Sequence, residues 1–259
     1  MQRWIEHAPI TDPGKMTAEL AAFGPTPEAA VEAIQGLLIH GGAVEHYGLQ
    51  TPDTFSRETL AVETRLAAIF SAGGGPLTRA RPAADRSLGT CRDYSLLLCA
   101  AMRGHGQPAR VRCGFASYLG DAWEDHWLCE VWADGRWRRI DAQLDSVLRE
   151  ALGIEFDPTD VPSEMFVTAD EAWRRSRGGE WDAGAFGHGE TRGLWFMCVN
   201  LMRDRLALAD CFTSDWDAWR VAASASPVLS AGAMALADSL AASPDVTEQT
   251  SLVPWWLSE

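Results

Sequence analysis

Apolar residues recur every three or four positions in two stretches of the first seventy residues, which is the spacing of an amphipathic helix. The first stretch, residues 27–40, follows Thr26, a favoured N-cap, and begins with Pro27, which suits the first helical position. The second stretch runs from about residue 56 to residue 70 and carries its leucine, isoleucine and phenylalanine side chains on one side. The glycine- and proline-rich residues 71–82 then end the periodic pattern, so two helices are predicted before this break.

The remainder of the chain predicts a helix, then strands, then more helices. Residues 91–104 carry an apolar stripe after a short Gly-Thr step and end in glycine, which predicts a helix. Residues 109–119 alternate apolar and polar side chains, which is the pattern of a half-buried strand. A Thr-Ala-Asp-Glu capping box at 168–171 opens a mainly helical last third, with apolar helices over 194–209 and 226–241. This order predicts an α+β fold.

An antiparallel hairpin is predicted over residues 126–145. Its two-residue turn is the Asp-Gly pair at 134–135, a dipeptide that accepts the positive φ angles such turns require. An aromatic pair and a pair of opposite charges then fall opposite each other, which supports the register. From the turn outwards, the register pairs Trp132 with Trp137, Glu130 with Arg139, and Leu128 with Asp141.

The same register predicts a catalytic arrangement. His126 becomes the diagonal neighbour of Asp141 on one face of the hairpin, roughly 7–8 Å away between backbones, and a carboxylate there would orient and stabilise an imidazolium. Cys91 lies at the start of a predicted helix, where the partial positive charge favours a thiolate and the first amides can bind an oxyanion. Cys91, His126 and Asp141 together therefore suit acyl transfer through a thioester.

Each of these residues also has a structural explanation when it is taken alone. A cysteine near a helix start is often a small buried hydrophobic side chain, and a histidine on a strand is often a satisfied hydrogen-bond partner. The joint pattern favours catalysis because three residue types fall on the three positions that this chemistry requires. The other cysteines are interpreted as structural and are expected to be buried: Cys99, Cys113, Cys129, Cys198 and Cys211.

No cofactor and no metal ion is expected. His126 and Cys129 are three positions apart on a strand, so they point to opposite faces and cannot share a zinc ion. The sequence has no His-Glu-x-x-His motif, no paired Cys-x-x-Cys motifs, no EF-hand loop and no Walker A motif.

The composition excludes several classes of partner and location. A formal net charge of −14 disfavours binding to nucleic acids and to anionic membrane surfaces. The longest run without charge, residues 221–237, is too short and too weakly apolar to span a bilayer. Six scattered cysteines and the lack of an export signal at the first residues predict a cytoplasmic protein with free thiols.

Residues 89–119 and 124–145 resemble the transglutaminase-like superfamily, which has a papain-type fold. The likeness lies in a Gly-x-Cys-Arg-Asp segment that opens a helix, a Pro-Ala-Arg strand, an Asp-His segment that runs into Glu-Val-Trp, and a Trp-x-x-Ile-Asp strand, in that order. The resemblance implies that Cys91 is the nucleophile, His126 the general base and Asp141 the orienting acid. It also implies a nucleophile helix packed on an antiparallel sheet. More loosely, the whole chain looks like bacterial stand-alone transglutaminase-like proteins.

The expected organisation is a single domain over residues 1–259, with a transglutaminase-like core at about 27–165, flanking helices, and a C-terminal helical extension at about 166–259. The expected function is hydrolysis of an amide or peptide through a Cys91 thioester. One alternative is an acyltransferase of small-molecule or peptide natural-product biosynthesis, which forms an amide bond between an amine acceptor and an acyl group from a carrier-protein thioester. In that case the arginines at 136–139 could dock the carrier. A catalytically silent binding module is the other alternative.

Overall fold

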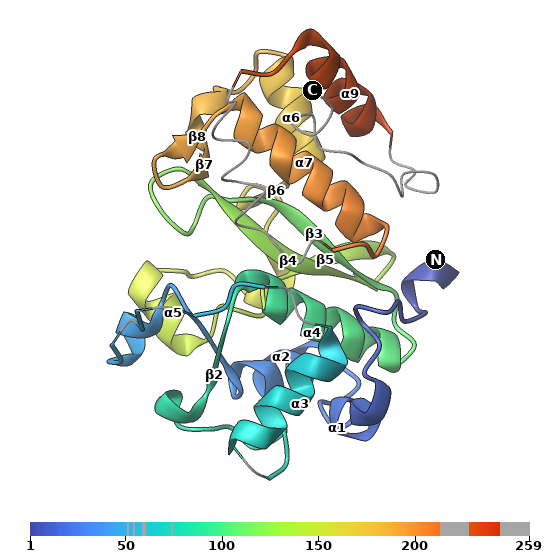
Figure 1. The fold of residues 1–259 in the computed structure, drawn as a ribbon, viewed down its shortest axis with the longest axis vertical. Coiled ribbons are helices and arrows are strands. Elements are labelled where there is room, and N and C mark those ends of the chain that lie inside the picture. The colour runs from blue at the N-terminus through green and yellow to red at the C-terminus, as the bar shows by residue number, and fades with distance from the viewer. Residues whose placement is uncertain (51, 54, 59–60, 74, 213–227, 244–259) are drawn as a thin grey trace. The chain divides into compact units, whose positions relative to one another are not determined.

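The structure is a computed structural model that describes residues 1–259 except 51, 54, 59–60, 74, 213–227 and 244–259 (Figure 1). It is a mixed α+β fold. The described helices are α1 (Thr17–Ala21), α2 (Pro27–Gln35), α3 (Val62–Gly73), α4 (Cys91–Gly104), α5 (Ser146–Leu152), α6 (Ala169–Arg177), α7 (Leu194–Leu208) and α9 (Ala231–Ala242). The described strands are β1 (Leu38–His40), β2 (Ser87–Gly89), β3 (Ala109–Ala116), β4 (Trp123–Ala133), β5 (Arg136–Ile140), β6 (Phe166–Thr168), β7 (Phe186–His188) and β8 (Thr191–Arg192).

The chain divides into two compact units. The first unit comprises residues 1–111 and 128–161, and the second comprises residues 112–127 and 162–259. Strands β3 and β4 therefore contribute residues to both units. The predicted division into a core and a C-terminal extension stays a prediction.

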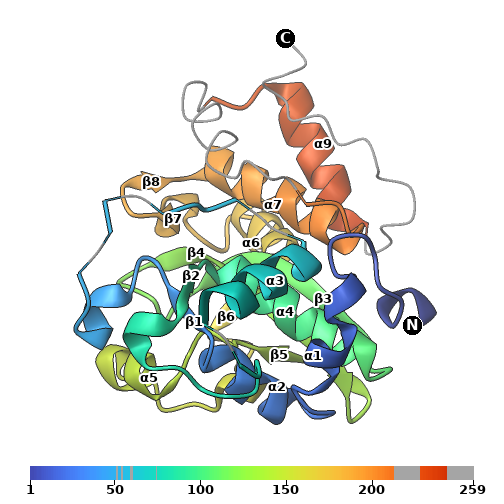
Figure 2. The ribbon, with the colours of Figure 1, turned by 60° about the horizontal axis from the view of Figure 1, so that its bottom comes forward.

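Helix α4 is packed by α1, α2 and α3 within the first unit (Figure 2). It begins at Cys91 with Thr90 as the N-cap, which confirms the predicted helix start. The Asp93 carboxylate accepts hydrogen bonds from the Thr90 backbone N–H at 2.7 Å and from the Thr90 hydroxyl at 3.2 Å. These bonds satisfy polar groups at the helix end that would otherwise lack partners, and they fix the turn that carries Cys91.

The two N-terminal helices are shorter than the periodicity predicts. Helix α2 begins at Pro27, with the Thr26 side chain as its cap, but ends at Gln35. Two carbonyl groups just beyond it, those of Gly36 and Leu37, accept hydrogen bonds from backbone N–H groups of residues 81 and 87. This pairing draws the chain into β1, which lies parallel to β2 and carries the next buried leucine.

Helix α3 begins at Val62, about six residues after its predicted start. The Val62 backbone N–H donates to the Ile10 carbonyl, and the Arg57 carbonyl accepts a hydrogen bond from the side chain of Arg92. In a helix, the Arg57 carbonyl would accept from the backbone N–H four residues further on. Here it accepts from a side chain of α4, a contact that helix periodicity alone does not reveal.

The hairpin of β4 and β5 has the predicted register. The turn residues Asp134 and Gly135 have φ angles of 53° and 76°, as this tight turn requires. Trp132 pairs with Trp137 and Glu130 with Arg139, and the two indole rings meet edge to face at a centroid distance of 5.4 Å. The register is thus confirmed from the turn to the pair Cys129–Ile140.

A six-stranded sheet has the order β6-β3-β4-β7-β8, with β5 paired to β4. In the second unit, β6 lies antiparallel to β3, and β7 lies parallel to β4. Helices α6, α7 and α9 pack against one another (Figure 1). Helix α6 begins at the predicted residue, although the Thr168 side chain makes no capping bond. Helix α9 begins at Ala231 and not at 226; part of its predicted first turn lies outside the described residues.

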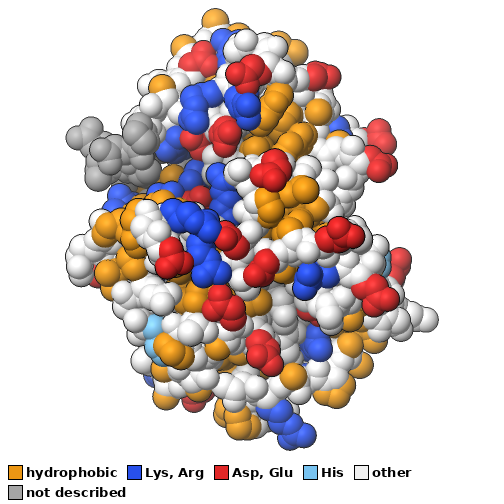
Figure 3. Space-filling view, turned by 180° about the vertical axis from the view of Figure 1, so that it is seen from behind, with side chains coloured by type: hydrophobic (Ala, Val, Ile, Leu, Met, Phe, Trp, Pro, Cys, Tyr) orange, Lys and Arg blue, Asp and Glu red, His pale blue; other side chains and the backbone are white. Residues whose placement is uncertain are grey.

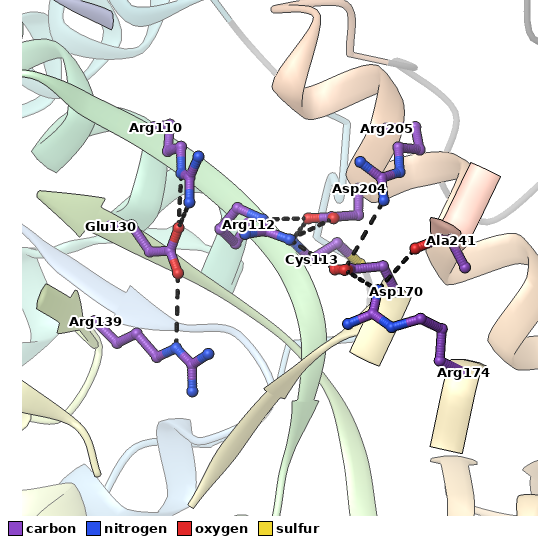
Figure 4. A network of polar contacts seen from close by, with 10 residues as sticks. All are labelled: Arg110, Arg112, Cys113, Glu130, Arg139, Asp170, Arg174, Asp204, Arg205 and Ala241. Atoms are coloured by element: carbon purple, nitrogen blue, oxygen red, sulfur yellow. Dashed lines mark hydrogen bonds and ion pairs between the residues drawn. The ribbon is translucent and has the colours of Figure 1, made fainter. Parts of the chain in front are cut away.

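Strand β3 is buried more completely than the predicted half-buried pattern. Its polar Arg112 is buried because the guanidinium is ion-paired with two carboxylates, those of Asp204 on α7 and Asp170 on α6 (Figure 4). Asp170 also accepts from Arg174 at 2.7 Å. The network joins β3, α6 and α7 of the second unit.

The Asp170 carboxylate is expected to make the protein sensitive to acid. Burial would raise its pKa, but the neighbouring Arg112 charge and the hydrogen bond from Arg174 outweigh burial and hold the pKa well below its ordinary value. A carboxylate whose pKa is lower in the folded state than in the unfolded state stabilises the fold. This contribution is fully present at pH values above the unfolded-state pKa of about 3.9 and is lost as the pH falls through the folded-state pKa. Asp170→Asn should therefore cost about 2 kcal/mol at pH 7 and less at pH 2.

Urea denaturation of both proteins at pH 7 and pH 2 measures this difference. Asp182→Asn is the control because that carboxylate is exposed and, within the described part of the chain, forms a local bond to the Gly184 N–H alone. An equal loss of stability at both pH values would contradict the assignment.

Within the described part of the chain, no helix combines the length and apolar character needed to cross a membrane. The cytoplasmic location stays a prediction.

Candidate functional site

Cys91 is the first residue of α4 and is half-buried. The short strand β2 ends at Gly89, so a single residue separates the strand from the helix. The Cys91 carbonyl accepts a hydrogen bond from the Ser95 hydroxyl at 2.9 Å. Because the thiol lies at the positive end of the helix macrodipole, this position favours the thiolate.

A buried ion pair braces the turn that carries Cys91. The Asp93 side chain is 3% exposed, and its Oδ1 lies 2.7 Å from Nη2 of Arg65 on α3. Nη1 of Arg65 donates to the Leu88 carbonyl at 3.2 Å, so the same guanidinium also holds β2. A carboxylate two residues from a thiolate would repel it, and the Arg65 charge offsets this effect. Sequence reasoning missed Arg65 because nothing marks a single arginine on a helix as a partner of Asp93.

Asp141 follows directly after β5 and is 1% exposed. Its backbone N–H donates to the Pro158 carbonyl at 2.8 Å, and its Oδ1 accepts from the Gln143 N–H at 3.1 Å. Both bonds link Asp141 to residues that follow it in the chain, and the bond from Gln143 holds the carboxylate itself. Asp141 belongs to the first unit, as Cys91 does.

His126 lies in β4 and is 1% exposed. The ring of Tyr118 stands edge-on to the imidazole, with a centroid distance of 6.0 Å and an interplanar angle of 83°. Both residues belong to the second unit. The structure therefore places Cys91 and Asp141 in one unit and His126 in the other, and the closure of the three into a triad stays a prediction.

The remaining cysteines differ in their surroundings. Cys99, Cys113, Cys129 and Cys198 are buried as expected, whereas Cys211 is exposed, so the prediction for Cys211 is wrong. Burial raises the pKa of the Cys198 thiol to about 12. Burial, with the neighbouring Cys99 thiol as a second cause, raises the pKa of Cys129 well above its ordinary value. Cys211 follows the C-terminal end of α7, whereas Cys91 is the first residue of α4.

Iodoacetamide is expected to alkylate Cys91 at least about tenfold faster than Cys211 at pH 7, because the N-terminus of α4 stabilises the reactive thiolate of Cys91. Peptide mapping after limited alkylation measures both rates in one sample. Cys211 is the internal control for accessibility, since it is the more exposed of the two. Equal rates, or faster labelling of Cys211, would identify Cys91 as a structural cysteine.

No metal centre is seen among the residues that the structure describes: no group of three or more His, Cys, Asp or Glu side chains lies together as ligands would. The expected independence from metal ions and cofactors stays a prediction.

Residues 50–142 match the family model of the transglutaminase-like superfamily. All three predicted site residues lie inside this segment, which confirms the resemblance seen in the motifs. No curated protein matches the chain. Among solved structures, the chain is similar to a candidate cysteine protease from Cytophaga hutchinsonii, with 18% identity and a TM-score of 0.41. The alignment covers 65% of this chain and 45% of that protein, so the chain spans less than half of the relative's length.

Proposed function

We propose that this protein is a transglutaminase-like cysteine enzyme that forms a thioester on Cys91 and hydrolyses an amide or peptide bond. The observation that carries the proposal is the place of Cys91: a half-buried thiol on the first residue of a helix, inside the segment that matches the superfamily. The buried cysteines of the described chain have no comparable position.

In the proposed reaction, the Cys91 thiolate attacks the carbonyl carbon of the substrate amide. The backbone N–H groups of the first turn of α4 are the donors available to the developing oxyanion. As the carbon–nitrogen bond breaks, protonated His126 gives its proton to the leaving amine. Neutral His126 then takes a proton from water, whose oxygen attacks the thioester and releases a carboxylic acid and the Cys91 thiolate. The Asp141 carboxylate would orient the imidazole through both steps.

A carrier-protein thioester is disfavoured as the acyl donor because the arginines expected to dock the carrier are already ion-paired. Arg136 bonds to Asp160 at 2.9 Å, and Arg138 bonds to Glu28 at 3.0 Å. Arg139 lies 3.6 Å from Glu130. On the face shown in Figure 3, basic side chains likewise lie beside acidic ones. An acidic carrier would have to displace these partners, which weakens the acyltransferase alternative.

Intact-mass spectrometry tests the proposal. The protein is incubated with a panel of peptide amides, aryl esters and acyl thioesters, and then quenched in acid. We expect an acyl adduct that maps to Cys91 and decays in water with release of the free acid. Addition of EDTA should leave the adduct yield and its decay unchanged.

The other outcomes discriminate between the alternatives. An adduct that is stable in water and discharges only to an added amine would indicate an acyltransferase. The lack of any adduct with all three substrate classes would favour the silent binding module and overturn the proposal.

A further inference from the structure

The residues on either side of His126 are both held by α7. In a β-strand, successive side chains point to opposite faces, so Asp125 and Trp127 share the face away from His126. Asn200 on α7 donates to Oδ1 of Asp125 at 2.8 Å. Arg203, one turn further along the helix, lies with Nη1 3.4 Å from Oδ2 of Asp125, and its guanidinium stacks 5.0 Å from the ring centre of Trp127.

The two α7 side chains also bind each other. Nη1 of Arg203 donates to the Asn200 side-chain oxygen at 3.0 Å, which orients the amide so that its NH₂ group faces Asp125. Asn200, Arg203 and Asp125 are all nearly inaccessible to solvent. Arg203 therefore contacts both neighbours of His126, and Asn200 provides a second contact to Asp125.

This polar cluster lies on a helix whose other buried side chains are mainly apolar. Trp195, Phe196, Val199 and Met202 of α7 belong to the hydrophobic core of the second unit. A buried ion pair is a poor way to stabilise a fold, because desolvation of the charges offsets most of their attraction, and apolar packing would serve equally well. Its directional bonds do, however, fix the position of a strand more narrowly than apolar contacts do.

We infer that Asn200 and Arg203 are positioning residues for His126. Their contacts with Asp125 and Trp127 fix this segment of β4, so the imidazole keeps one orientation. On the opposite face, the ring of Tyr118 stands against the imidazole edge to face. The inference rests on the proposed function for its catalytic consequence, but the orientation of the ring can be measured without any substrate.

The test uses Asn200→Leu and Arg203→Met in the full chain, with Arg203→Lys as the conservative variant. Cys198→Ala is the matched control, since Cys198 is buried on the same helix and forms no bond to β4 in the described contacts. Long-range ¹H–¹⁵N correlation spectra report the tautomer and line width of the His126 ring, assigned by comparison with His126→Asn. Hydrogen exchange reports the opening of the β4 backbone.

We expect a single His126 tautomer in the parent protein and in Cys198→Ala. In Asn200→Leu and Arg203→Met, the ring signals should show a mixture of tautomers, and exchange of the Trp127 amide should quicken at least tenfold. Arg203→Lys keeps the positive charge and should show a smaller share of the second tautomer than Arg203→Met. With an active substrate, kcat should fall by about 10- to 100-fold in both variants while KM stays within about twofold.

Unchanged His126 ring signals in both variants, with hydrogen exchange no faster than in the control, would overturn the positioning role and leave a structural one. If the parent protein forms no acyl adduct, the proposed function fails, while the ring and exchange measurements still decide the positioning role. If Arg203→Met does not fold, Asn200→Leu decides alone.

Discussion

Replacement of Cys91 by alanine is expected to remove the acyl adduct completely and to lower turnover by about 10⁴-fold or more. The nucleophile takes part in every step of the proposed reaction, and loss of a nucleophile costs more than loss of any group that acts through it. The side chain is small and half-buried at a helix N-terminus, so its removal should leave the fold intact. Circular dichroism and a thermal melt check the fold, and intact mass and product release check the chemistry.

Cys211→Ala is the matched control, because it removes the exposed thiol at the end of α7 and leaves the α4 terminus unchanged. It should retain full adduct formation and turnover. Residual turnover above about 1% in Cys91→Ala, or an adduct that survives on another residue, would show that Cys91 is not the nucleophile. The same loss of activity in both variants would point to a structural effect of thiol removal.

Features that depend on neighbouring residues could be predicted from the sequence. The Asp134-Gly135 turn sets the register of the hairpin by itself, because few dipeptides accept two positive φ angles in a two-residue loop. The start of α4 at Cys91 follows from Thr90 and Asp93, which lie three residues apart and bond to each other. In both cases, the residues that determine the local structure are close together in the sequence, so the sequence pattern is sufficient to predict it.

Features that depend on distant partners could not be predicted. Arg65 and Asp93 are 28 positions apart, and Asp125 and Asn200 are 75 positions apart. Nothing in the local pattern says which carboxylate a buried arginine will meet. The same reason applies to the late start of α3, because the Arg57 carbonyl, inside the predicted helix, bonds to the Arg92 side chain 35 positions away.

The predicted half-buried character of β3 was wrong for a related reason. Periodicity treats arginine as a marker of a solvent-facing position, yet Arg112 is buried. Its charge is accommodated because α6 and α7 each supply a carboxylate. A charged side chain in a strand therefore indicates either solvent or a partner, and only the tertiary structure distinguishes the two.

Removal of the Asp204 carboxylate on α7 alone is expected to destabilise the second unit strongly, because it uncouples a buried ion pair. Asp204 is 0% exposed and accepts from Nε and Nη2 of Arg112, each at 2.9 Å, so the pair is bidentate. It also accepts from the Cys113 backbone N–H at 2.9 Å. Asp204→Ala would remove one of the carboxylates that pair with the buried guanidinium and the acceptor of the Cys113 backbone N–H. We expect a loss of about 3–5 kcal/mol in the free energy of unfolding, measured by urea denaturation.

Two further variants separate the ion pair from the fold around it. Asp160→Ala removes a carboxylate from an exposed pair with Arg136 and should change the stability little, because solvent screens such pairs. Arg112→Met combined with Asp204→Leu removes both buried charges and should recover most of the stability lost in Asp204→Ala, since packed apolar side chains substitute well for a buried ion pair. If the double variant is no more stable than Asp204→Ala, the lost stability comes from packing or from the Cys113 N–H bond, and the charge of Arg112 is not its cause.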